Sequence, residues 1–227
     1  PPWTLHHDVG LVGALLWSVG LALLALPRVL PGRWLGAVLL GVALLPRERP
    51  LADGEFRVLQ LDVGQGLAVL VRTRQHALLY DTGPRWTDSA DAGSRLIAPY
   101  LRGSGAGRIH GLVVSHLDID HSGGARSLLN MLPVDWMLTS VFNEADIVTV
   151  ARSRGVTPIA CIRGQSWQWD GVRFEVLHPE ADSYLEAKLK TNDRSCVIKV
   201  SSAQFSALLT ADLEALSERA LVERYAD

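Results

Sequence analysis

The stretch from Gly111 to Leu132 constrains the fold of this chain more than any other. It opens with an apolar run that predicts a buried strand, and it closes with leucines at helical spacing. Between these elements, His116, Asp118, Asp120 and His121 fall within six positions and are followed by two glycines. A tight strand-to-helix turn holds such side chains at the surface on a fixed backbone. Imidazole nitrogen combined with carboxylate oxygen suits zinc, manganese or iron, so the turn predicts a metal site. The alternative is a polar loop with solvated acids and incidental histidines.

Length, charge and cysteine content set the broad class. The 227 residues are enough for one sizeable core and an appendage, and a net charge of −2 offers no overall basic field for nucleic acid. Cys161 and Cys196 give no disulfide framework. Cys196 is expected to be a small buried residue, and whether the two cysteines pair stays open. The chain lacks both an initiator methionine and a basic signal-peptide region, so it is expected to be a fragment of a longer protein.

Two apolar runs occupy the first fifty residues. Residues 9–26 carry no charge and only one polar side chain, Ser18, which is just enough length to span a bilayer as a helix. Residues 34–45 form a shorter run for which a buried core helix is the rival interpretation. Arginines at the ends of both runs favour a pair of membrane helices in residues 1–50. Two arginines in the short link between the runs predict a cytoplasmic link, with the rest of the chain on the far side.

Residues 46–54 form a charged, proline-bearing linker, and the domain boundary is placed within it, so that residues 51–227 form a separate domain. Its apolar runs predict strands near 56–63, 67–71, 76–80, 111–114, 134–139, 166–169, 172–177, 195–200 and 204–210, with Asp170-Gly171 as a hairpin turn between the sixth and the seventh. Helices are predicted near 94–101, 125–132, 144–154 and 214–225, and residues 84–94 are predicted to be a loop. Two groups of strands separated by helices predict two sheets packed face to face with helices outside.

Three aspartates share one kind of position. Asp81 and Asp212 each follow an apolar strand directly, and Asp120 lies just beyond another. If the ends of these strands gather at one rim, the three carboxylates and the two histidines form a metal basket. Each acid taken alone is more simply explained as an ordinary turn aspartate.

Five ordered motifs resemble the C-terminal, metallo-β-lactamase-like domain of the ComEC competence-protein family. They are Leu61-Asp62-Val63-Gly64-Gln65-Gly66, Leu79-Tyr80-Asp81-Thr82-Gly83, Ser115 to Gly124, Asn192-Asp193-Arg194-Ser195 and Leu209-Thr210-Ala211-Asp212. The resemblance covers roughly residues 55–227, and the apolar lead-in matches the end of that family's membrane channel domain. It implies an αββα metallo-β-lactamase-like sandwich, incomplete at the C-terminus and preceded by transmembrane helices.

The family's role implies an activity and a set of ligands. The resemblance implies a multi-pass protein of the bacterial inner membrane, with this domain extracytoplasmic, that works with other DNA-uptake components in natural transformation. The domain would be a metal-dependent nuclease that degrades the DNA strand that is not imported. By position, His116 and Asp118 would hold one divalent ion, Asp120 and His121 a second, and Asp212 would bridge them. Asp120, His121 and Asp212 would be the catalytic set.

Other motif positions imply supporting roles and a metal preference. Asp81 would brace the metal loop, while Asn192, Ser195 and Asp62 would support the ligands or contact the substrate. Asp118 stands where the wider fold usually has a histidine, which makes the ligand set richer in oxygen. This favours manganese, with zinc as the alternative.

The chain departs from the family pattern at three places. Leu67 replaces an aspartate, which would remove local polar support near the site, and Ala211 replaces the glycine before Asp212, with a small effect expected. The family's later His-His-Gly segment does not occur before Asp227, so the chain as given is expected to be weakly active at best.

Two other functions stay open. One is a generic metallo-hydrolase of small esters, lactams or phosphodiesters. The other is a catalytically degenerate domain that binds single- or double-stranded DNA or gates a channel.

Overall fold

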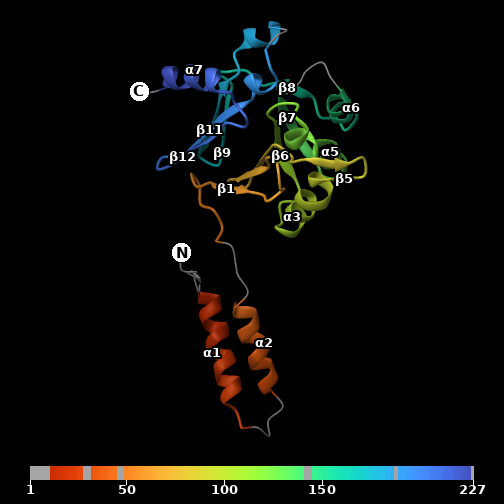
Figure 1. The fold of residues 1–227 in the computed structure, drawn as a ribbon. Helices are drawn as coiled ribbons and strands as arrows, with labels where there is room; N and C mark the ends of the chain where they lie inside the picture. Colours follow the sequence, from red (N-terminus) through yellow and green to blue (C-terminus); the bar gives the residue numbers. More distant parts are fainter. Residues whose placement is uncertain (1–10, 28–31, 45–48, 141–144, 187–188, 226–227) are drawn as a thin grey trace. The chain divides into compact units, whose positions relative to one another are not determined.

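The computed structural model describes residues 11–27, 32–44, 49–140, 145–186 and 189–225. The chain forms two compact units, residues 1–50 and 51–227 (Figure 1). The first unit contains α1 (Leu11–Ala25) and α2 (Arg33–Leu44). The second contains twelve short strands and the remaining helices of the described residues.

The helices of the first unit pack closely because small residues meet between them. A side-chain carbon added to Gly36 would lie 2.6 Å from the carbonyl oxygen of Gly20, a distance that only glycine tolerates. The Arg33 guanidinium also donates to the Leu24 carbonyl at 3.1 Å. The two apolar runs are helical over residues 11–25 and 33–44, as predicted, and residues 9, 10 and 45 of these runs lie outside the described residues.

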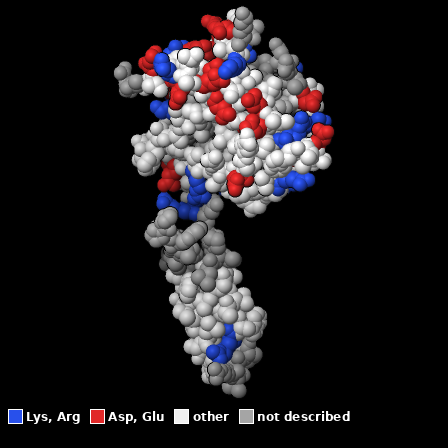
Figure 2. All heavy atoms as spheres, viewed as in Figure 1, with Lys and Arg blue, Asp and Glu red and all other residues white. Residues whose placement is uncertain are grey.

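The expected membrane spans are not shown. Helices α1 and α2 contain 15 and 12 residues, and no helix in the described ranges is both long and apolar enough to cross a bilayer. On the face seen in Figure 2, the helical unit shows no acidic residues along its length, whereas the second unit mixes acidic and basic side chains.

The second unit is built on two sheets. The six-stranded sheet has the order β1 (Arg57–Gln60), β2 (Val69–Arg72), β3 (Ala77–Tyr80), β6 (Ile109–Val114), β7 (Val134–Thr139) and β8 (Pro158–Ala160). The first three strands form an antiparallel meander, and β3, β6, β7 and β8 run parallel. The four-stranded antiparallel sheet has the order β12 (Ser206–Leu209), β11 (Val197–Ser201), β10 (Val172–His178) and β9 (Ser166–Trp169).

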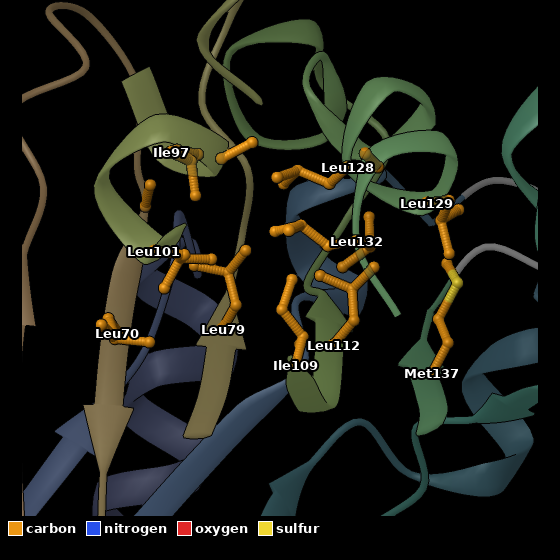
Figure 3. Close-up of a cluster of buried hydrophobic side chains, with 14 of the residues drawn as sticks. Leu70, Leu79, Ile97, Leu101, Ile109, Leu112, Leu128, Leu129, Leu132 and Met137 are labelled. Atoms are coloured by element: carbon orange, nitrogen blue, oxygen red, sulfur yellow. The ribbon is translucent and has the colours of Figure 1, made fainter. Parts of the chain in front are cut away.

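Alternation along the central strands creates two hydrophobic cores. Leu70, Leu79 and Leu112 face the helices and pack with Leu101 and Leu128, as Figure 3 shows. Their sequence neighbours Val71, Leu78 and Val113 face the other way and pack on Phe174 and Ile198 of the four-stranded sheet. The helices α3 (Ala98–Gly103), α5 (Ala125–Met131) and α6 (Ala145–Ser153) cover the outer face of the six-stranded sheet (Figure 1). The predicted face-to-face sheets with outer helices are confirmed by this arrangement.

Local departures from the predicted elements have physical causes. Residues 84–94, predicted to be a loop, contain a two-stranded ribbon, β4 (Arg85–Thr87) and β5 (Ala90–Asp91). The helix predicted at 94–101 begins as a π-helical turn, Gly93–Ile97, and continues as α3, where Pro99 occupies the first turn and needs no hydrogen-bond donor. The final helix, α7 (Ala215–Tyr225), buries none of its residues.

The structure joins Cys161 and Cys196, the pairing that the sequence left open. Their Cα atoms lie 5.9 Å apart across a sequence separation of 35, and both residues are fully buried. Cys161 follows β8 and Cys196 precedes β11, so the disulfide ties the two sheets together. Cys196 also accepts a hydrogen bond from the Tyr80 hydroxyl and donates its backbone N–H to the Ser115 carbonyl.

A second link between the sheets lies at the turn between β9 and β10. The Asp170 carboxylate accepts hydrogen bonds from the Thr73 hydroxyl at 2.6 Å, the Gln75 backbone N–H at 2.7 Å and His76 Nδ1 at 3.0 Å. The His76 ring stacks on Trp169. Burial favours the neutral acid, but these donors outweigh it and lower the pKa of Asp170 to about 2.

Candidate metal centre

Four chain segments bring polar side chains to one end of the sandwich. Asp81 follows β3, Ser115 and His116 follow β6, and His121 lies in the short helix α4 (Ile119–Ser122). Asp212 follows β12, which belongs to the other sheet. The parallel pairing of β3 with β6 places the ends of both strands side by side, which explains why residues 34 positions apart meet.

A single buried carboxylate organises this end of the sandwich. Asp81 Oδ1 accepts the Ser115 backbone N–H at 2.7 Å, and Asp81 Oδ2 accepts the Ser115 hydroxyl at 2.6 Å. His121 Nδ1 lies 2.8 Å from the same Oδ2 atom, and His116 Nδ1 lies 2.9 Å from Ser115 Oγ. Because Ser115 gives its only hydroxyl proton to Asp81, it must accept a proton from His116. Both imidazoles therefore carry hydrogen at Nδ1.

This tautomer leaves the lone pair of each Nε2 atom for another partner. His121 Nε2 lies 3.3 Å from Asp212 Oδ1, and His116 Nε2 lies 3.8 Å from Asp118 Oδ2. Within the described residues, His116 Nε2 is buried without any hydrogen-bond partner. The two rings are close neighbours, with centroids 4.2 Å apart. Two lone pairs thus face two carboxylates in one small volume.

The electrostatics of the two histidines differ. Burial and the neighbouring His121 ring lower the pKa of His116, which favours its neutral form. Burial also opposes charge on His121, but the hydrogen bond and the charge of Asp81 outweigh it and raise the pKa of that imidazole. Neutral imidazole is the form that binds metal ions.

Backbone hydrogen bonds connect the loop that carries the histidines to the turn after β1. The Leu67 N–H donates to the Asp120 carbonyl at 3.1 Å, and the Gly83 N–H donates to the Leu67 carbonyl at 2.8 Å. Gly66 has a φ of +122°, and a side-chain carbon there would lie 2.1 Å from the Asp120 carbonyl oxygen. Only glycine permits this approach. Thr82 adds two donors, its N–H and its hydroxyl, to the His121 carbonyl.

A cavity of about 440 Å³ opens beside these groups. Asp120, His121 and Asp212 are among its lining residues. Its other walls come from β1, from the turn at Leu67 and from β12.

The other residues singled out in the sequence have different positions. Asn192 Oδ1 and Asp118 Oδ1 each lie 3.1 Å from the Thr191 hydroxyl, so the Asn192 loop adjoins the first metal position. Ser195 is fully buried, and its hydroxyl has no partner within the described residues. Asp62 is exposed, accepts the Gly64 N–H at 3.3 Å and does not line the cavity. The structure does not bring it to the cluster.

Sequence reasoning missed the hydroxyl groups. Ser115 connects Asp81 to His116, and Thr191 approaches Asp118, yet neither was assigned a role. Ser115 precedes the first histidine directly, which is a usable signal. Nothing in the local sequence distinguishes Thr191, because its contact spans 73 positions.

The donor set fits divalent metal ions. Asp81, His116 and His121 each offer a ligand atom within 4.8 Å of the others, and all three residues are buried. The oxygens of Asp81 already accept three hydrogen bonds, so its geometry suits a brace better than a ligand. His116 and His121, with Asp118 and Asp212 opposite, are the groups that would hold the ions.

Comparison with known proteins gives two levels of similarity. Residues 61–140 match the metallo-beta-lactamase superfamily, in agreement with the observed two-sheet fold. The chain is 35% identical over 199 residues to the uncharacterized protein YcaI of Escherichia coli and 34% identical over 203 residues to competence protein ComA of Neisseria gonorrhoeae. It is 33% identical over 173 residues to recombination protein 2 of Haemophilus influenzae.

These alignments cover most of this chain but a small part of each relative. They include 87%, 89% and 75% of the chain, and 24%, 26% and 20% of the respective relatives. The chain therefore spans about a quarter of the length of the curated relatives it matches. Together with a further match named ComE operon protein 3, from Bacillus subtilis, they show that the chain belongs to the ComEC-like family of competence proteins and contains its metallo-β-lactamase-type domain.

Proposed function

We propose that this chain is part of an inner-membrane protein for DNA internalisation, and that its 51–227 unit is a metal-dependent nuclease that degrades the strand that is not imported. The observation that carries the proposal is the shared brace at Asp81. It fixes the tautomer of both imidazoles and leaves each Nε2 atom opposite a carboxylate. A domain that only binds DNA or gates a channel has no need of such an arrangement.

The ligand positions give each residue a role. His116 and Asp118 would hold one ion, Asp120 and His121 a second, and Asp212 would bridge the two. Two divalent ions in such a site supply charge stabilisation of a phosphodiester and activation of water. The chain itself holds the imidazoles in the Nδ1–H form, orients Asp212 towards His121 and keeps Asp120 at the cavity wall. Asn192 would orient a phosphate oxygen from the loop beside Asp118.

Manganese is the proposed metal. Three carboxylates, from Asp118, Asp120 and Asp212, accompany two imidazoles, and ligand sets rich in oxygen favour manganese over zinc. Competence-related names among the relatives support DNA as the substrate and DNA-uptake components as partners.

The disulfide supports an extracytoplasmic position for the 51–227 unit. Disulfides persist in oxidising compartments and are rare in the bacterial cytoplasm. The Cys161–Cys196 bond lies in the core of this unit, so the unit is proposed to face the outside of the inner membrane. The helices α1 and α2 would then belong to the membrane part of a multi-pass protein.

Metal removal and replacement in the purified chain tests this function. After chelation, single metals are restored, and thermal stability is measured alongside cleavage of single-stranded DNA and of bis(p-nitrophenyl) phosphate. We expect manganese to raise the melting temperature and to restore cleavage of DNA in preference to the small diester. Zinc-only activity would reject the manganese assignment. A metal effect with turnover only of small esters or diesters would favour a generic metallo-hydrolase, and no metal effect at all would favour the degenerate domain.

Substitution of Asp81, the carboxylate that positions both histidines, tests the proposal most directly. In Asp81→Asn the amide replaces an acceptor with a donor, so His121 must place its hydrogen on Nε2 and lose that ligand atom. Asp81 has a φ of +59°, which asparagine also tolerates, so the backbone is kept. We expect metal affinity to fall about 10–100-fold. Asp88→Asn, in the exposed β4–β5 turn, is the matched control. Unchanged metal affinity in Asp81→Asn would contradict the assignment.

A further inference from the structure

The segment that precedes β11 reaches the metal centre through one hydroxyl group. Thr191 Oγ1 lies 3.1 Å from Asp118 Oδ1, which belongs to a residue 73 positions away in the chain, and 3.1 Å from Asn192 Oδ1. A hydroxyl has a single proton to donate, and an ionised carboxylate is a stronger acceptor than an amide oxygen. The proton of Thr191 is therefore assigned to Asp118.

Asp118 does not use its side chain in the way that is usual for its position. It is the N-cap residue of α4, and an aspartate there normally accepts a hydrogen bond from a backbone N–H of the first turn. Within the described part of the chain, the Asp118 side chain forms no such capping bond. The carboxylate is therefore directed to groups outside its own helix.

The two oxygens of the Asp118 carboxylate have different neighbours. Oδ1 accepts the Thr191 hydroxyl, whereas Oδ2 lies 3.8 Å from His116 Nε2, which is too far for a hydrogen bond. The Asp118 side chain is 45% exposed, so without a donor it would rotate among several conformers. The bond from Thr191 restricts this rotation and keeps Oδ2 on the side of the unpartnered His116 nitrogen.

Contacts on both sides of Thr191 hold its segment in place. The Lys190 ammonium pairs with the Glu214 carboxylate at 2.9 Å, and the Ser217 hydroxyl donates to Asp193 Oδ1 at 2.7 Å. Glu214 precedes α7 and Ser217 lies in its first turn, so both contacts tie the segment to the chain just after the proposed bridging ligand. The Thr191 hydroxyl is therefore presented by a segment that is tethered on either side.

We propose that Thr191 is a positioning residue for the first metal position. Its hydroxyl fixes the conformation of the Asp118 side chain, so that one carboxylate oxygen stays available to an ion shared with His116. This inference rests on the proposed function, because it concerns a ligand of the metal centre assigned there. Thr191 is exposed, so removal of its hydroxyl leaves no cavity in either core. An effect on metal binding can therefore be separated from an effect on folding.

Manganese binding to substituted chains tests this role without any measurement of cleavage. Free manganese is followed by its electron paramagnetic resonance signal during titration of the purified chain, and the melting temperature of the metal-free chain is recorded alongside. We expect Thr191→Val, which keeps the shape of the side chain, to weaken the binding of one ion about tenfold and to leave the metal-free melting temperature unchanged. Thr191→Ser keeps the hydroxyl and should bind manganese as the unmodified chain does.

The matched control is Thr157→Val. Thr157 is also exposed, and it precedes β8, at the end of the parallel strands opposite to the metal centre. This substitution should change neither manganese binding nor the melting temperature. A second background shows whether Thr191 acts through Asp118. In Asp118→Ala the carboxylate is gone, so the addition of Thr191→Val should weaken manganese binding no further.

Three results would overturn the positioning role while leaving the metal centre in place. They are unchanged manganese binding in Thr191→Val, binding by Thr191→Ser that is as weak as that of the valine variant, and additive losses when Thr191→Val is combined with Asp118→Ala. Failure of the unmodified chain to bind manganese or any other divalent ion would overturn both the metal centre and the role of Thr191.

Discussion

Removal of the Cys161–Cys196 bond gives a prediction whose size can be worked out from the structure. The bond joins the end of β8 to the start of β11 and so links the two sheets covalently. Replacing both cysteines with alanine breaks the link without leaving a free thiol. Reduction of the unmodified chain provides an independent way to reach the same state.

Loop length sets the expected magnitude. Closing a loop with a sequence separation of 35 lowers the entropy of the unfolded chain enough to stabilise the folded state by about 4 kcal/mol in the chain-entropy treatment. For a unit of this size, that loss lowers the melting temperature by about 8–16 °C. The loss of sulfur from a fully buried position adds to the effect of the substitution but not to that of reduction.

Thermal unfolding of the whole chain, with and without a reducing agent, measures the effect. The oxidised chain should yield no free thiols when titrated in denaturant, and reduction should lower its melting temperature. The double alanine variant should melt low in both conditions, because it has no bond to reduce. Two titratable thiols in chain isolated from an oxidising compartment would refute the reasoning, as would a melting temperature indifferent to reduction. Either result would also remove the disulfide as support for an extracytoplasmic position.

Two further substitutions test the Asp170 link between the sheets and the backbone conformation at Ala211. Asp170 is only 11% exposed, and its pKa is lowered to about 2 from an ordinary 3.8. Its ionised form therefore stabilises the folded chain by about 2 kcal/mol above pH 4, and this stabilisation is lost as the pH falls towards 2. Asparagine tolerates the φ of +47° at this position, so Asp170→Asn should lower the free energy of unfolding by about 2 kcal/mol at pH 7. Denaturant titrations of the variant should show a smaller fall in the free energy of unfolding between pH 4 and pH 2. A fall as large as that of the unmodified chain would contradict this. Ala211→Gly should stabilise the chain by about 0.5–1 kcal/mol, because Ala211 has a φ of +47° that glycine adopts without strain; a lower denaturation midpoint would show that the strain is not relieved.

Local patterns explain how much of the fold and site could be predicted. The strand and the helix at the two ends of residues 111–132 are encoded by neighbouring residues, so β6 and α5 follow from periodicity. The one-turn helix α4 lies where only a turn was predicted. The approach of Asp212 to His121 was inferred from the position of each acid after a strand and from the family resemblance, not from local periodicity. The contact of Thr191 with Asp118 and the link between Asp170 and Thr73 were missed, because each joins residues more than seventy positions apart.

Two of the three departures from the family pattern show why residue identity alone misjudges a site. Alanine for glycine before Asp212 was expected to matter little, but the backbone at Ala211 is left-handed, so the substitution places strain directly beside a proposed bridging ligand. Leucine at position 67 suggested lost polar support, yet the bonds that support the metal loop come from the Leu67 backbone and survive the change of side chain. What the leucine alters is the cavity wall. The same substitution therefore keeps the backbone hydrogen bonds that support the loop and changes only a side chain that lines the cavity.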